Sequence, residues 1–345
     1  MVTEQKKLGV AVVGLGKYCR EELMPALQQT QSCFLAGIVT GHDDKKQEIQ
    51  RQYALEEKNC YTYDTFDDIA DNPGIDIVYV ALPNAMHAEY VIRAAKAGKH
   101  VICEKPLARN LNECYNMASA VEEAGVRCSM GYRLHFDPYH QELMRLGQQQ
   151  VFGAIKEMTL LNSMKITDPA AWRLNKDLAG GGPLMNNGIY CVQAAMYISG
   201  QLPVAILAEY LPATDKRSLR GVEEGIRWQM DFDSGMTAAC ETGFSKNQNL
   251  IQVQAETGWF ELAPAFEYRG LKGAFSGGLI HFPEVNQQAR QMDDFAECII
   301  YNKPSRAPLN MGIRDMKIVE AIYESAESGK RIQLNLSEYA FLPEI

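Results

Sequence analysis

The feature of this chain that most restricts its fold is a regular alternation of short apolar runs with helical patterns over the first 130 residues. The runs, each predicted to be a strand, cover residues 8–13, 34–39, 75–82, 100–103 and 127–131. The helical patterns between them cover residues 21–29, 43–53, 66–70, 87–97 and 111–124. Strands that alternate with helices form right-handed βαβ units. We therefore predict an α/β dinucleotide-binding domain of the Rossmann type over residues 1–130.

The pattern changes in the second part of the chain to longer segments of alternating hydrophobicity. These segments cover residues 155–163, 205–210, 226–232, 236–241, 250–255 and 258–262. Such alternation is typical of antiparallel strands with one exposed face. Helices are expected at 184–199, 289–301 and 313–328. We predict that residues 131–345 form an α+β domain, an open and mostly antiparallel sheet with helices, which binds the substrate and forms the oligomer.

Composition excludes several other classes of protein. The chain has 345 residues, and 34 Lys and Arg against 43 Asp and Glu give a net charge of −9, which argues against nucleic-acid binding. No stretch approaches the roughly 18 apolar residues of a membrane helix. The sequence enters its first apolar run without an export signal, so a cytoplasmic location is expected. The nine cysteines form no Cys-x-x-Cys motif or Cys/His cluster, which predicts free buried thiols and no metal site.

The first chemical motif is Gly14-Leu15-Gly16, followed by Lys17 and Tyr18, at the end of the first predicted strand. Glycines at a strand-to-helix turn let the backbone approach a pyrophosphate, whose charge meets the free N–H groups of the helix start. The third position of the usual motif is a cysteine here, which lowers its specificity. Its place after the first strand of a βαβ series still predicts dinucleotide binding.

The end of the second predicted strand indicates which dinucleotide is bound. An NAD enzyme usually carries Asp or Glu there to hold the ribose 2′-hydroxyl. This chain has Thr40-Gly41-His42 with Lys45 nearby, which favours the 2′-phosphate of NADP over NAD. The alternative is that Thr40 only caps the next helix and Lys45 is a surface charge, and the acidic pair at 43 and 44 keeps this alternative open.

Two further motifs follow the next strands. Leu82, Pro83, Asn84 and His87 come after the third long apolar run, and Glu104-Lys105-Pro106 comes after the fourth. Ligands of open α/β sheets bind outside the carboxyl ends of the strands, so both motifs are placed to reach a cofactor. The alternative for Glu104 and Lys105 is an ion pair at the protein surface.

Together with the segment Gly180-Gly181-Gly182-Pro183-Leu184-Met185-Asn186-Asn187-Gly188-Ile189-Tyr190, these motifs resemble the Gfo/Idh/MocA family of sugar oxidoreductases, and most of all its glucose-fructose oxidoreductase branch. The resemblance continues through Gly131-Tyr132-Arg133 and Trp172-Arg173 and spans almost the whole chain. It implies a Rossmann domain followed by an open sheet, with a nicotinamide cofactor and a sugar as ligands.

The resemblance also implies roles for individual residues. Lys105 and Tyr190 correspond to the pair that serves the reaction in the family, although Tyr190 alone could be a core tyrosine. Chemically, oxidation of a hydroxyl requires removal of a proton, and a nearby ammonium ion stabilises the phenolate form of a tyrosine. Trp172 and Arg173 correspond to residues near the cofactor. Substrate contacts are expected from Tyr132, Arg133 and Asn186.

Asn186 departs from the family, which usually has Asp there, and an amide cannot act as a base.

Three hypotheses for the function follow from the sequence. The first hypothesis is an NADP-dependent sugar or polyol oxidoreductase. The second is a relative that acts on an anhydro-sugar, a xylose or a dihydrodiol, and the third is a regulator that binds NADP without catalysis. Relatives with such sheets pair them, so a homodimer or homotetramer is expected.

Overall fold

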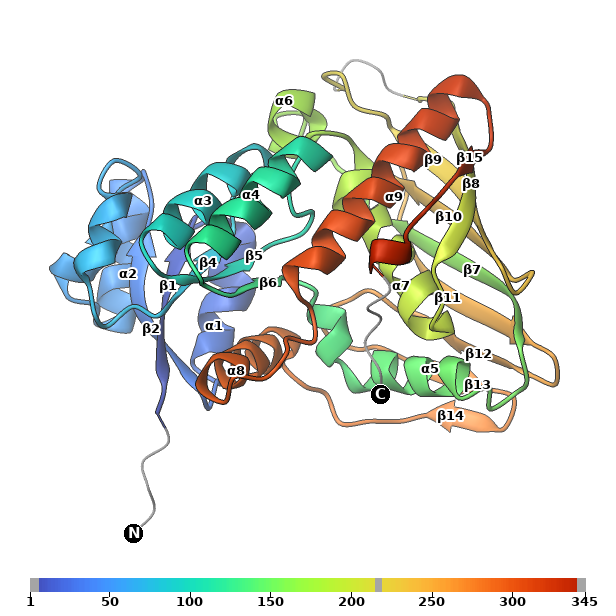
Figure 1. Cartoon of the computed structure of the whole chain (residues 1–345), viewed down its shortest axis with the longest axis horizontal. Coiled ribbons are helices and arrows are strands. Elements are labelled where there is room, and N and C mark those ends of the chain that lie inside the picture. Colours follow the sequence, from blue (N-terminus) through green and yellow to red (C-terminus); the bar gives the residue numbers. More distant parts are fainter. Residues whose placement is uncertain (1–5, 215–218, 340–345) are drawn as a thin grey trace, which may run out of the picture. The chain divides into compact units, whose positions relative to one another are not determined.

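The computed structural model describes residues 6–214 and 219–339, and the chain divides into two compact units (Figure 1). The first unit comprises the chain up to Ala108 together with Asn112–Arg133 and Asn286–Leu309. The second comprises Arg109–Leu111, Leu134–Val285 and the chain from Asn310 onward. This division differs from a single boundary near residue 130 mainly because one late segment returns to the first unit.

The first unit is built on a parallel sheet of six strands in the order β3-β2-β1-β4-β5-β6. Its strands are β1 (Leu8–Val13), β2 (Cys33–Val39), β3 (Cys60–Tyr61), β4 (Ile77–Val80), β5 (His100–Cys103) and β6 (Cys128–Met130). Every residue of β1 is buried, as expected for a sheet covered on both faces. The strand order is that of a Rossmann sheet, so this part of the fold prediction is confirmed.

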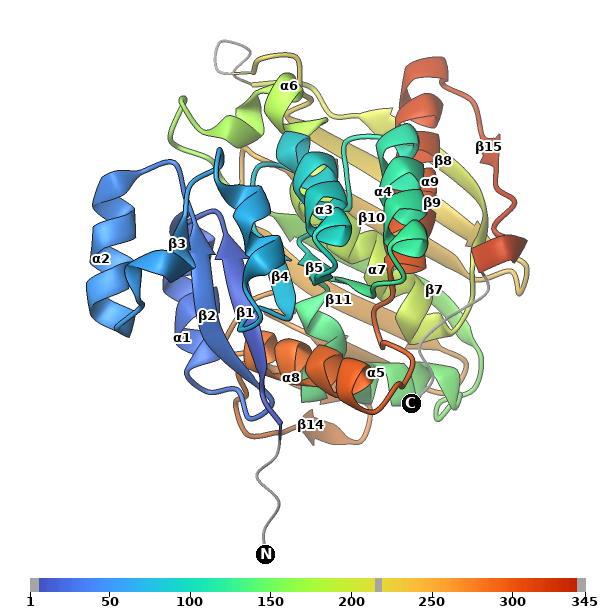
Figure 2. The ribbon, with the colours of Figure 1, turned by 60° about the vertical axis from the view of Figure 1, so that its left-hand side comes forward.

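Helices of two groups cover the sheet of the first unit. Helices α3 (His87–Lys96) and α4 (Leu111–Glu123) lie side by side in Figure 2. Helices α1 (Met24–Leu27) and α8 (Gln287–Ile300) pack against β2, while α2 (Asp43–Tyr53) follows that strand. Met292 and Phe295 of α8 enter the same buried cluster as Val10 and Val12. This apolar packing explains why a helix from the end of the chain belongs to the first unit.

The second unit contains a sheet of nine strands in the order β14-β13-β12-β11-β7-β10-β9-β8-β15. The strands are β7 (Ile155–Ser163), β8 (Pro203–Tyr210), β9 (Gly225–Phe232), β10 (Thr237–Gly243), β11 (Gln248–Ala255), β12 (Trp259–Leu262), β13 (Gly273–Phe275), β14 (Gly278–Ile280) and β15 (Ile332–Gln333). Every neighbouring pair is antiparallel except β7 and β10. The predicted open, mostly antiparallel sheet is therefore confirmed.

The helices of the second unit are α5 (Pro138–Gln148), α6 (Lys176–Ala179), α7 (Ile189–Ser199) and α9 (Leu309–Ser328). Every residue of α7 except its second is buried, and the helix packs against α5, β7 and β10. Such a helix, apolar on all sides, forms the centre of a core rather than a surface. A π-helical turn, Leu184–Gly188, leads into α7. The predicted helix at 184–199 is thus correct in extent but changes type at its start.

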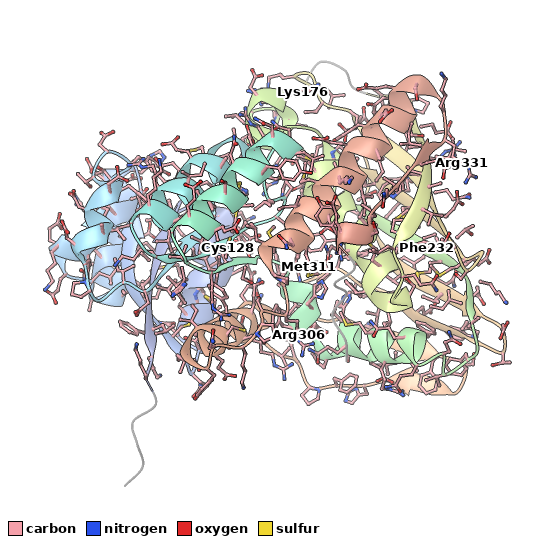
Figure 3. The ribbon with its side chains drawn as sticks, in the orientation of Figure 1. Cys128, Lys176, Phe232, Arg306, Met311 and Arg331 are labelled. Carbon is pink, nitrogen blue, oxygen red and sulfur yellow. The ribbon has the colours of Figure 1, made fainter. Side chains whose placement is uncertain are left out.

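All nine cysteines are buried and free, as the sequence predicted, and burial raises the pKa of Cys19 and Cys128 to about 12. Cys128, labelled in Figure 3, lies on β6 inside the first unit. Within residues 6–214 and 219–339, no helix is long and apolar enough to cross a membrane. Over the same ranges, no group of three His, Cys, Asp or Glu side chains could hold a metal ion.

Candidate functional site

The candidate site of the first unit is the edge of the parallel sheet where the strands end. Because β1, β2, β4 and β5 all run the same way, the segments that follow them meet at one edge. Strand order reverses between β1 and β4, and ligands of open α/β sheets bind at such a switch point. Gly14-Leu15-Gly16 follows β1, and Leu82-Pro83-Asn84 follows β4, so both motifs flank the switch point.

The structure gives different reasons for glycine at the two positions of the first motif. Gly14 has a φ of +94°, and a Cβ there would lie 2.6 Å from the carbonyl oxygen of Ala81. A Cβ at Gly16 would meet no protein atom within 4 Å. Gly14 is therefore required by the fold, while the open space beside Gly16 fits the approach of a dinucleotide pyrophosphate. Leu15 is buried beside them, and the Lys17 side chain is 81% exposed.

At the end of β2, the structure shows a turn organised by Thr40. Thr40 is buried, and its hydroxyl oxygen accepts a hydrogen bond from the backbone N–H of His42 at 3.2 Å. Gly41 packs near the ring of Tyr63, which would lie 3.1 Å from a Cβ there. Lys45 is partly exposed on the first turn of α2. Thr40 organises the turn rather than capping α2, whose N-cap is His42.

The loop after β4 is held by a buried histidine. The two ring nitrogens of His87 lie 2.9 Å from the carbonyl oxygens of Leu82 and Pro106. Burial lowers the pKa of His87, although these carbonyl contacts act in the opposite direction. His87 therefore links the loop after β4 to the loop after β5. Asn84, in the loop after β4, is also buried, and Pro83 is partly exposed.

Glu104 is a buried carboxylate at the end of β5. The hydroxyl of Tyr79 donates to its Oε1 at 2.8 Å, and Tyr18 also hydrogen-bonds to it. Burial raises the pKa of Glu104, while the charge of the neighbouring Lys105 and these hydrogen bonds oppose the rise. A Cβ at Gly131 would lie 2.9 Å from the carboxyl group. Glu104 is thus a fixed support beside Lys105, which is partly exposed, and not an ion pair at the surface.

Helix α8 adds glutamines that the sequence analysis missed. Gln291 donates to the hydroxyl of Tyr79 at 3.0 Å and so continues the network that begins at Glu104. Gln287 hydrogen-bonds to Arg133, and both side chains are buried, as is Tyr132. The glutamines lie one helical turn apart on one face of α8. The sequence placed this helix in the second domain, so their connection to the strand edge could not be predicted.

A separate group of candidate residues surrounds Tyr190 in the second unit. Tyr190 is the second residue of α7, is partly exposed, and lies 6.2 Å from Phe266 between ring centroids. Asn186, four residues earlier in the π-helical turn, accepts a hydrogen bond from Nε of Arg173 at 2.9 Å. The Asn186 amide nitrogen donates to Asn187 at 2.6 Å. The structure therefore brings Arg173 and Asn186 together with the start of the helix that carries Tyr190.

Arg173 lies over the face of Trp172, with 4.6 Å between the guanidinium carbon and the ring centroid. Burial lowers the pKa of Arg173, and nearby Tyr268 and Tyr190 oppose this effect. Trp172 and Arg173 belong to a short 3₁₀ helix, Trp172–Leu174. The predicted pair thus presents a cation and an aromatic face near the tyrosine hydroxyls.

The loop that carries Phe266 and Tyr268 was not singled out in the sequence. Its backbone is held by Asn249 on β11, whose side-chain oxygen accepts from the N–H groups of Ala265 and Phe266 at 2.6 and 2.7 Å. The aromatic pair two residues apart between two strands was the only available signal. This aromatic pair does not belong to a recognisable sequence motif, because its role depends on a contact with a helix more than 70 residues earlier.

A second carboxylate, which is partly buried, supports the glycine-rich segment before Tyr190. Glu223 accepts hydrogen bonds from the N–H groups of Gly182 at 2.8 Å and Leu184 at 3.2 Å, and from the hydroxyl of Tyr323 at 3.0 Å. Burial raises the pKa of Glu223. A Cβ at Gly181 would lie 2.2 Å from the Tyr323 oxygen. This close packing explains why the segment is rich in glycine.

Comparisons with known proteins agree with this architecture. Residues 8–132 match the family "Oxidoreductase family, NAD-binding Rossmann fold", and residues 140–261 match the GFO/IDH/MocA C-terminal domain. Residues 281–334 match "Oxidoreductase family, C-terminal alpha/beta domain". The crystal structure of aldose-aldose oxidoreductase from Caulobacter crescentus, complexed with glycerol, is 37% identical with a TM-score of 0.93, over 95% of this chain and all of that chain. The chain belongs to the Gfo/Idh/MocA oxidoreductase family.

Other known proteins are similar to this chain at lower identity. D-xylose 1-dehydrogenase (NADP(+)) 2 of Haloferax volcanii is 29% identical over 95% of this chain and 98% of its own length. A levoglucosan dehydrogenase structure, solved with NADH and levoglucosan, is 21% identical with a TM-score of 0.83 over 95% of this chain and 99% of that chain. The latter shows the shared fold. These findings establish the chain as a family oxidoreductase with an NAD(P)-binding Rossmann fold.

Proposed function

We propose that this chain transfers hydride between NADP and a sugar or sugar-derived hydroxyl or carbonyl group. The observation that carries the proposal is the surroundings of Tyr190, where Arg173 and Asn186 supply hydrogen-bond donors and acceptors beside Phe266 and Trp172. Multiple polar contacts together with aromatic faces suit a ligand that has hydroxyl groups and an apolar ring face. The full-length similarity to an aldose-aldose oxidoreductase and a xylose dehydrogenase supports a sugar as that ligand.

In this proposal Tyr190 accepts the hydroxyl proton during oxidation and returns it during reduction. Lys105 assists by favouring the phenolate, which is the role that the resemblance gives it. Nicotinamide, when bound, supplies the hydride acceptor or donor. Tyr132, Arg133 and Asn186 are proposed to contact the sugar.

The NADP preference rests on the end of β2. Thr40, Gly41 and Lys45 offer a 2′-phosphate a turn that has no carboxylate in the usual ribose position. The open space at Gly16, with the exposed Lys17 beside it and Tyr18 in the following helix, suits the pyrophosphate. The loops at Leu82–Asn84 and Glu104–Lys105 are proposed to meet the rest of the cofactor.

The alternatives are another substrate, such as an anhydro-sugar, a xylose or a dihydrodiol, and an NADP-sensing regulator without catalysis. Asn186 in place of an acidic residue favours the regulator, whereas the presence of both Tyr190 and Lys105 favours an enzyme. The test is Tyr190→Phe, with Tyr301→Phe as a control on an exposed tyrosine. We expect Tyr190→Phe to abolish NADPH formation from sugars and to leave NADP affinity unchanged. Equal loss of turnover and NADP affinity would make Tyr190 a structural residue.

The exposed face of the second sheet is proposed as the contact of a homodimer or homotetramer. It has a hollow of about 560 Å³ whose lining includes Thr159, Leu161, Leu207 and Ala239, and Leu207 is 43% exposed. An apolar patch in a sheet centre is typical of an interface. Leu207→Glu should reduce the molar mass measured by analytical ultracentrifugation to that of one chain. An unchanged mass of several chains would place the interface elsewhere.

A further inference from the structure

Helix α7 carries a second tyrosine on the same face as Tyr190. Tyr197 lies seven residues after Tyr190, which is about two helical turns. The Tyr197 side chain is buried, and its hydroxyl lies 2.6 Å from Nδ1 of His140 on α5. The two rings also pack edge-on, with 5.9 Å between their centroids. The helix that carries Tyr190 is therefore joined to His140 by a hydrogen bond and by a ring contact.

His140 also contacts the loop that carries Phe266. The histidine is fully buried, and its Nε2 lies 2.7 Å from the carbonyl oxygen of Ala265. A carbonyl oxygen can only accept, so we place the ring proton on Nε2, and Nδ1 then accepts from the Tyr197 hydroxyl. His140 thus uses one nitrogen as a donor and the other as an acceptor, which an apolar side chain of similar size could not do.

The backbone of the loop is held from two sides. Asn249 on β11 accepts from the N–H groups of Ala265 and Phe266, while His140 donates to the carbonyl oxygen of Ala265. Phe266 is 5% exposed, and its ring centroid lies 6.2 Å from that of Tyr190 and 6.4 Å from that of His140. Since side chains from two other elements satisfy these backbone groups, the ring of Phe266 has little freedom to move away from Tyr190.

This double attachment has a physical reason. Loops are more mobile than the elements that they connect, and Phe266 lies on a loop whereas Tyr190 lies on a helix of the core. A shift of about 1 Å in a group that orients the substrate can lower a rate by about 10²-fold. A buried histidine that hydrogen-bonds both to the helix and to the loop keeps the distance between the two aromatic rings constant.

We propose that His140 is a positioning residue of the site around Tyr190. Through Tyr197 and the carbonyl group of Ala265, it holds the ring of Phe266 beside Tyr190 and so shapes the aromatic wall against which the ligand binds. This inference rests on the proposed function, because it assigns the ligand to the same site. His140 is itself fully buried, so its effect on the ligand passes through Phe266.

The first experiment observes the surroundings of Tyr190 without turnover. Fluorine NMR is recorded on protein labelled with 3-fluorotyrosine, and the Tyr190 signal is assigned by its loss in Tyr190→Phe. We expect this signal to shift in His140→Leu and in Phe266→Leu. It should keep the wild-type position in His140→Gln, whose amide supplies both a donor and an acceptor.

The matched control is His100→Leu. His100 belongs to the first unit, and its Nδ1 accepts from the backbone N–H of Arg127 at 3.0 Å. This substitution also removes a hydrogen-bonded histidine, but it should leave the Tyr190 signal unchanged. Thermal unfolding checks that each variant is folded.

The second experiment measures NADPH formation from D-glucose and from D-xylose. We expect His140→Leu to lower kcat/KM for the sugar by about 10-fold or more, with NADP affinity unchanged and most of the activity recovered in His140→Gln. Tyr197→Phe keeps the contact with Ala265 and should lower kcat/KM less. If His140 acts through Phe266, His140→Leu combined with Phe266→Leu should be no slower than the slower single variant, because both changes break one connection.

The inference is overturned if a folded His140→Leu protein keeps the wild-type Tyr190 signal, if His140→Gln is as impaired as His140→Leu, or if the losses multiply in the double variant. The proposed function can fail separately. A protein that reduces NADP with neither sugar, yet shows the His140-dependent shift of the Tyr190 signal, would keep the positioning role and lose the reaction. A protein that oxidises a sugar with no effect of His140→Leu in either experiment would do the reverse.

Discussion

In each unit a carboxylate supports the candidate catalytic residue, but the hydrogen-bond donors to the two carboxylates differ. In the first unit, the buried carboxylate Glu104 precedes Lys105 and accepts hydrogen bonds from tyrosine hydroxyls. In the second, the partly buried carboxylate Glu223 holds the segment before Tyr190 and accepts from two backbone N–H groups and Tyr323. A hydroxyl can donate or accept, whereas a backbone N–H can only donate. If the carboxylate is replaced by an amide, the hydrogen bonds from tyrosine hydroxyls around Glu104 can therefore rearrange. The hydrogen bonds from backbone N–H groups around Glu223 cannot.

The units also differ in how their sites are assembled. The first collects short loops at the ends of neighbouring parallel strands, so most of its candidate residues belong to local motifs. The second brings together Trp172–Leu174, the start of α7 and the loop at Phe266, which are far apart in the sequence. We assign cofactor binding mainly to the first unit and proton transfer to the second. The predictions below test this assignment, beginning with the largest expected effect.

Lys105→Met tests whether the first unit contributes only to cofactor binding or also to the reaction. Loss of a cation that stabilises a developing negative charge typically lowers kcat by about 10²- to 10³-fold. We expect this loss in steady-state NADPH formation, with NADP affinity reduced much less and partial recovery in Lys105→Arg. A variant that loses affinity but keeps kcat would restrict Lys105 to cofactor binding.

Substitutions of the two glycines in the loop after β1 distinguish an effect on stability from an effect on cofactor binding. Gly14→Ala forces a residue with a side chain to a φ of +94° and against the Ala81 carbonyl, which should lower the free energy of unfolding by about 1–3 kcal/mol. Gly16→Ala meets no protein atom within 4 Å, so its free energy of unfolding should change by less than about 0.5 kcal/mol. Its NADP affinity should instead fall by about 10-fold or more, because the methyl group occupies the space left for the pyrophosphate. Urea denaturation and fluorescence titration measure the two effects.

Equal effects of the two glycine substitutions on stability would contradict this interpretation of the loop. Normal NADP binding by a folded Gly16→Ala protein would place the pyrophosphate elsewhere along the strand edge.

Replacing the two supporting carboxylates, Glu104 and Glu223, with glutamine tests the comparison directly. Glu223→Gln turns an amide N–H toward a backbone N–H and should cost about 1–3 kcal/mol at pH 7. Glu104→Gln should cost less than about 1 kcal/mol, since the hydroxyl of Tyr79 can rotate to accept from the new amide. Chemical denaturation of both variants measures the difference, and a larger loss in Glu104→Gln would reverse our ranking.

The same pair predicts a pH dependence. Burial raises the pKa of both carboxyl groups above their ordinary value of 4.5, so the folded chain retains protons that the unfolded chain has released. Each group therefore makes the free energy of unfolding fall as pH rises above about 4.5, until the raised pKa of the folded state is passed. Each glutamine variant should show a shallower decline than the wild type. Identical slopes would mean that neither group binds protons differently in the folded chain.

The smallest expected effect is at Lys45, which is partly exposed. Lys45→Ala should reduce the preference for NADP over NAD by about 2- to 5-fold, because exposed charges interact weakly. Lys58→Ala is the control, since Lys58 is exposed and pairs with Glu56 at 2.9 Å. A preference that does not change would assign the 2′-phosphate to the turn at Thr40 alone.

The sequence predicted five of the six strands of the Rossmann sheet, because an apolar run marks each of those five. β1 and α2 were predicted with the bounds that the structure shows. Short elements such as β3, β13, β14 and β15 were missed, since two or three residues leave no detectable periodicity. Helix α5 was also missed, although Asp137 caps it by accepting from Tyr139 and a proline follows the cap.

Prediction of the site succeeded where a motif is local and failed where partners are distant. Gly14 and Gly16 could be identified from their spacing, but only the structure distinguishes the glycine needed by the fold from the one that leaves open space. Arg173 was named for its donors, yet its pairing with Asn186 depends on a contact between two segments. Gln291 and Phe266 belong to no motif, because their roles arise from a helix that returns to the first unit and a loop held by Asn249.

The most direct test of the central claim follows reduced nicotinamide in the purified wild-type protein by its near-ultraviolet absorbance. NADP is added first, and glucose and xylose are then added in separate experiments, with NAD in parallel samples. We predict that absorbance rises after at least one sugar is added and that the rise is faster with NADP than with NAD. Bound NADP with no rise for any member of a broad sugar panel would contradict the account and favour a regulator that senses the cofactor.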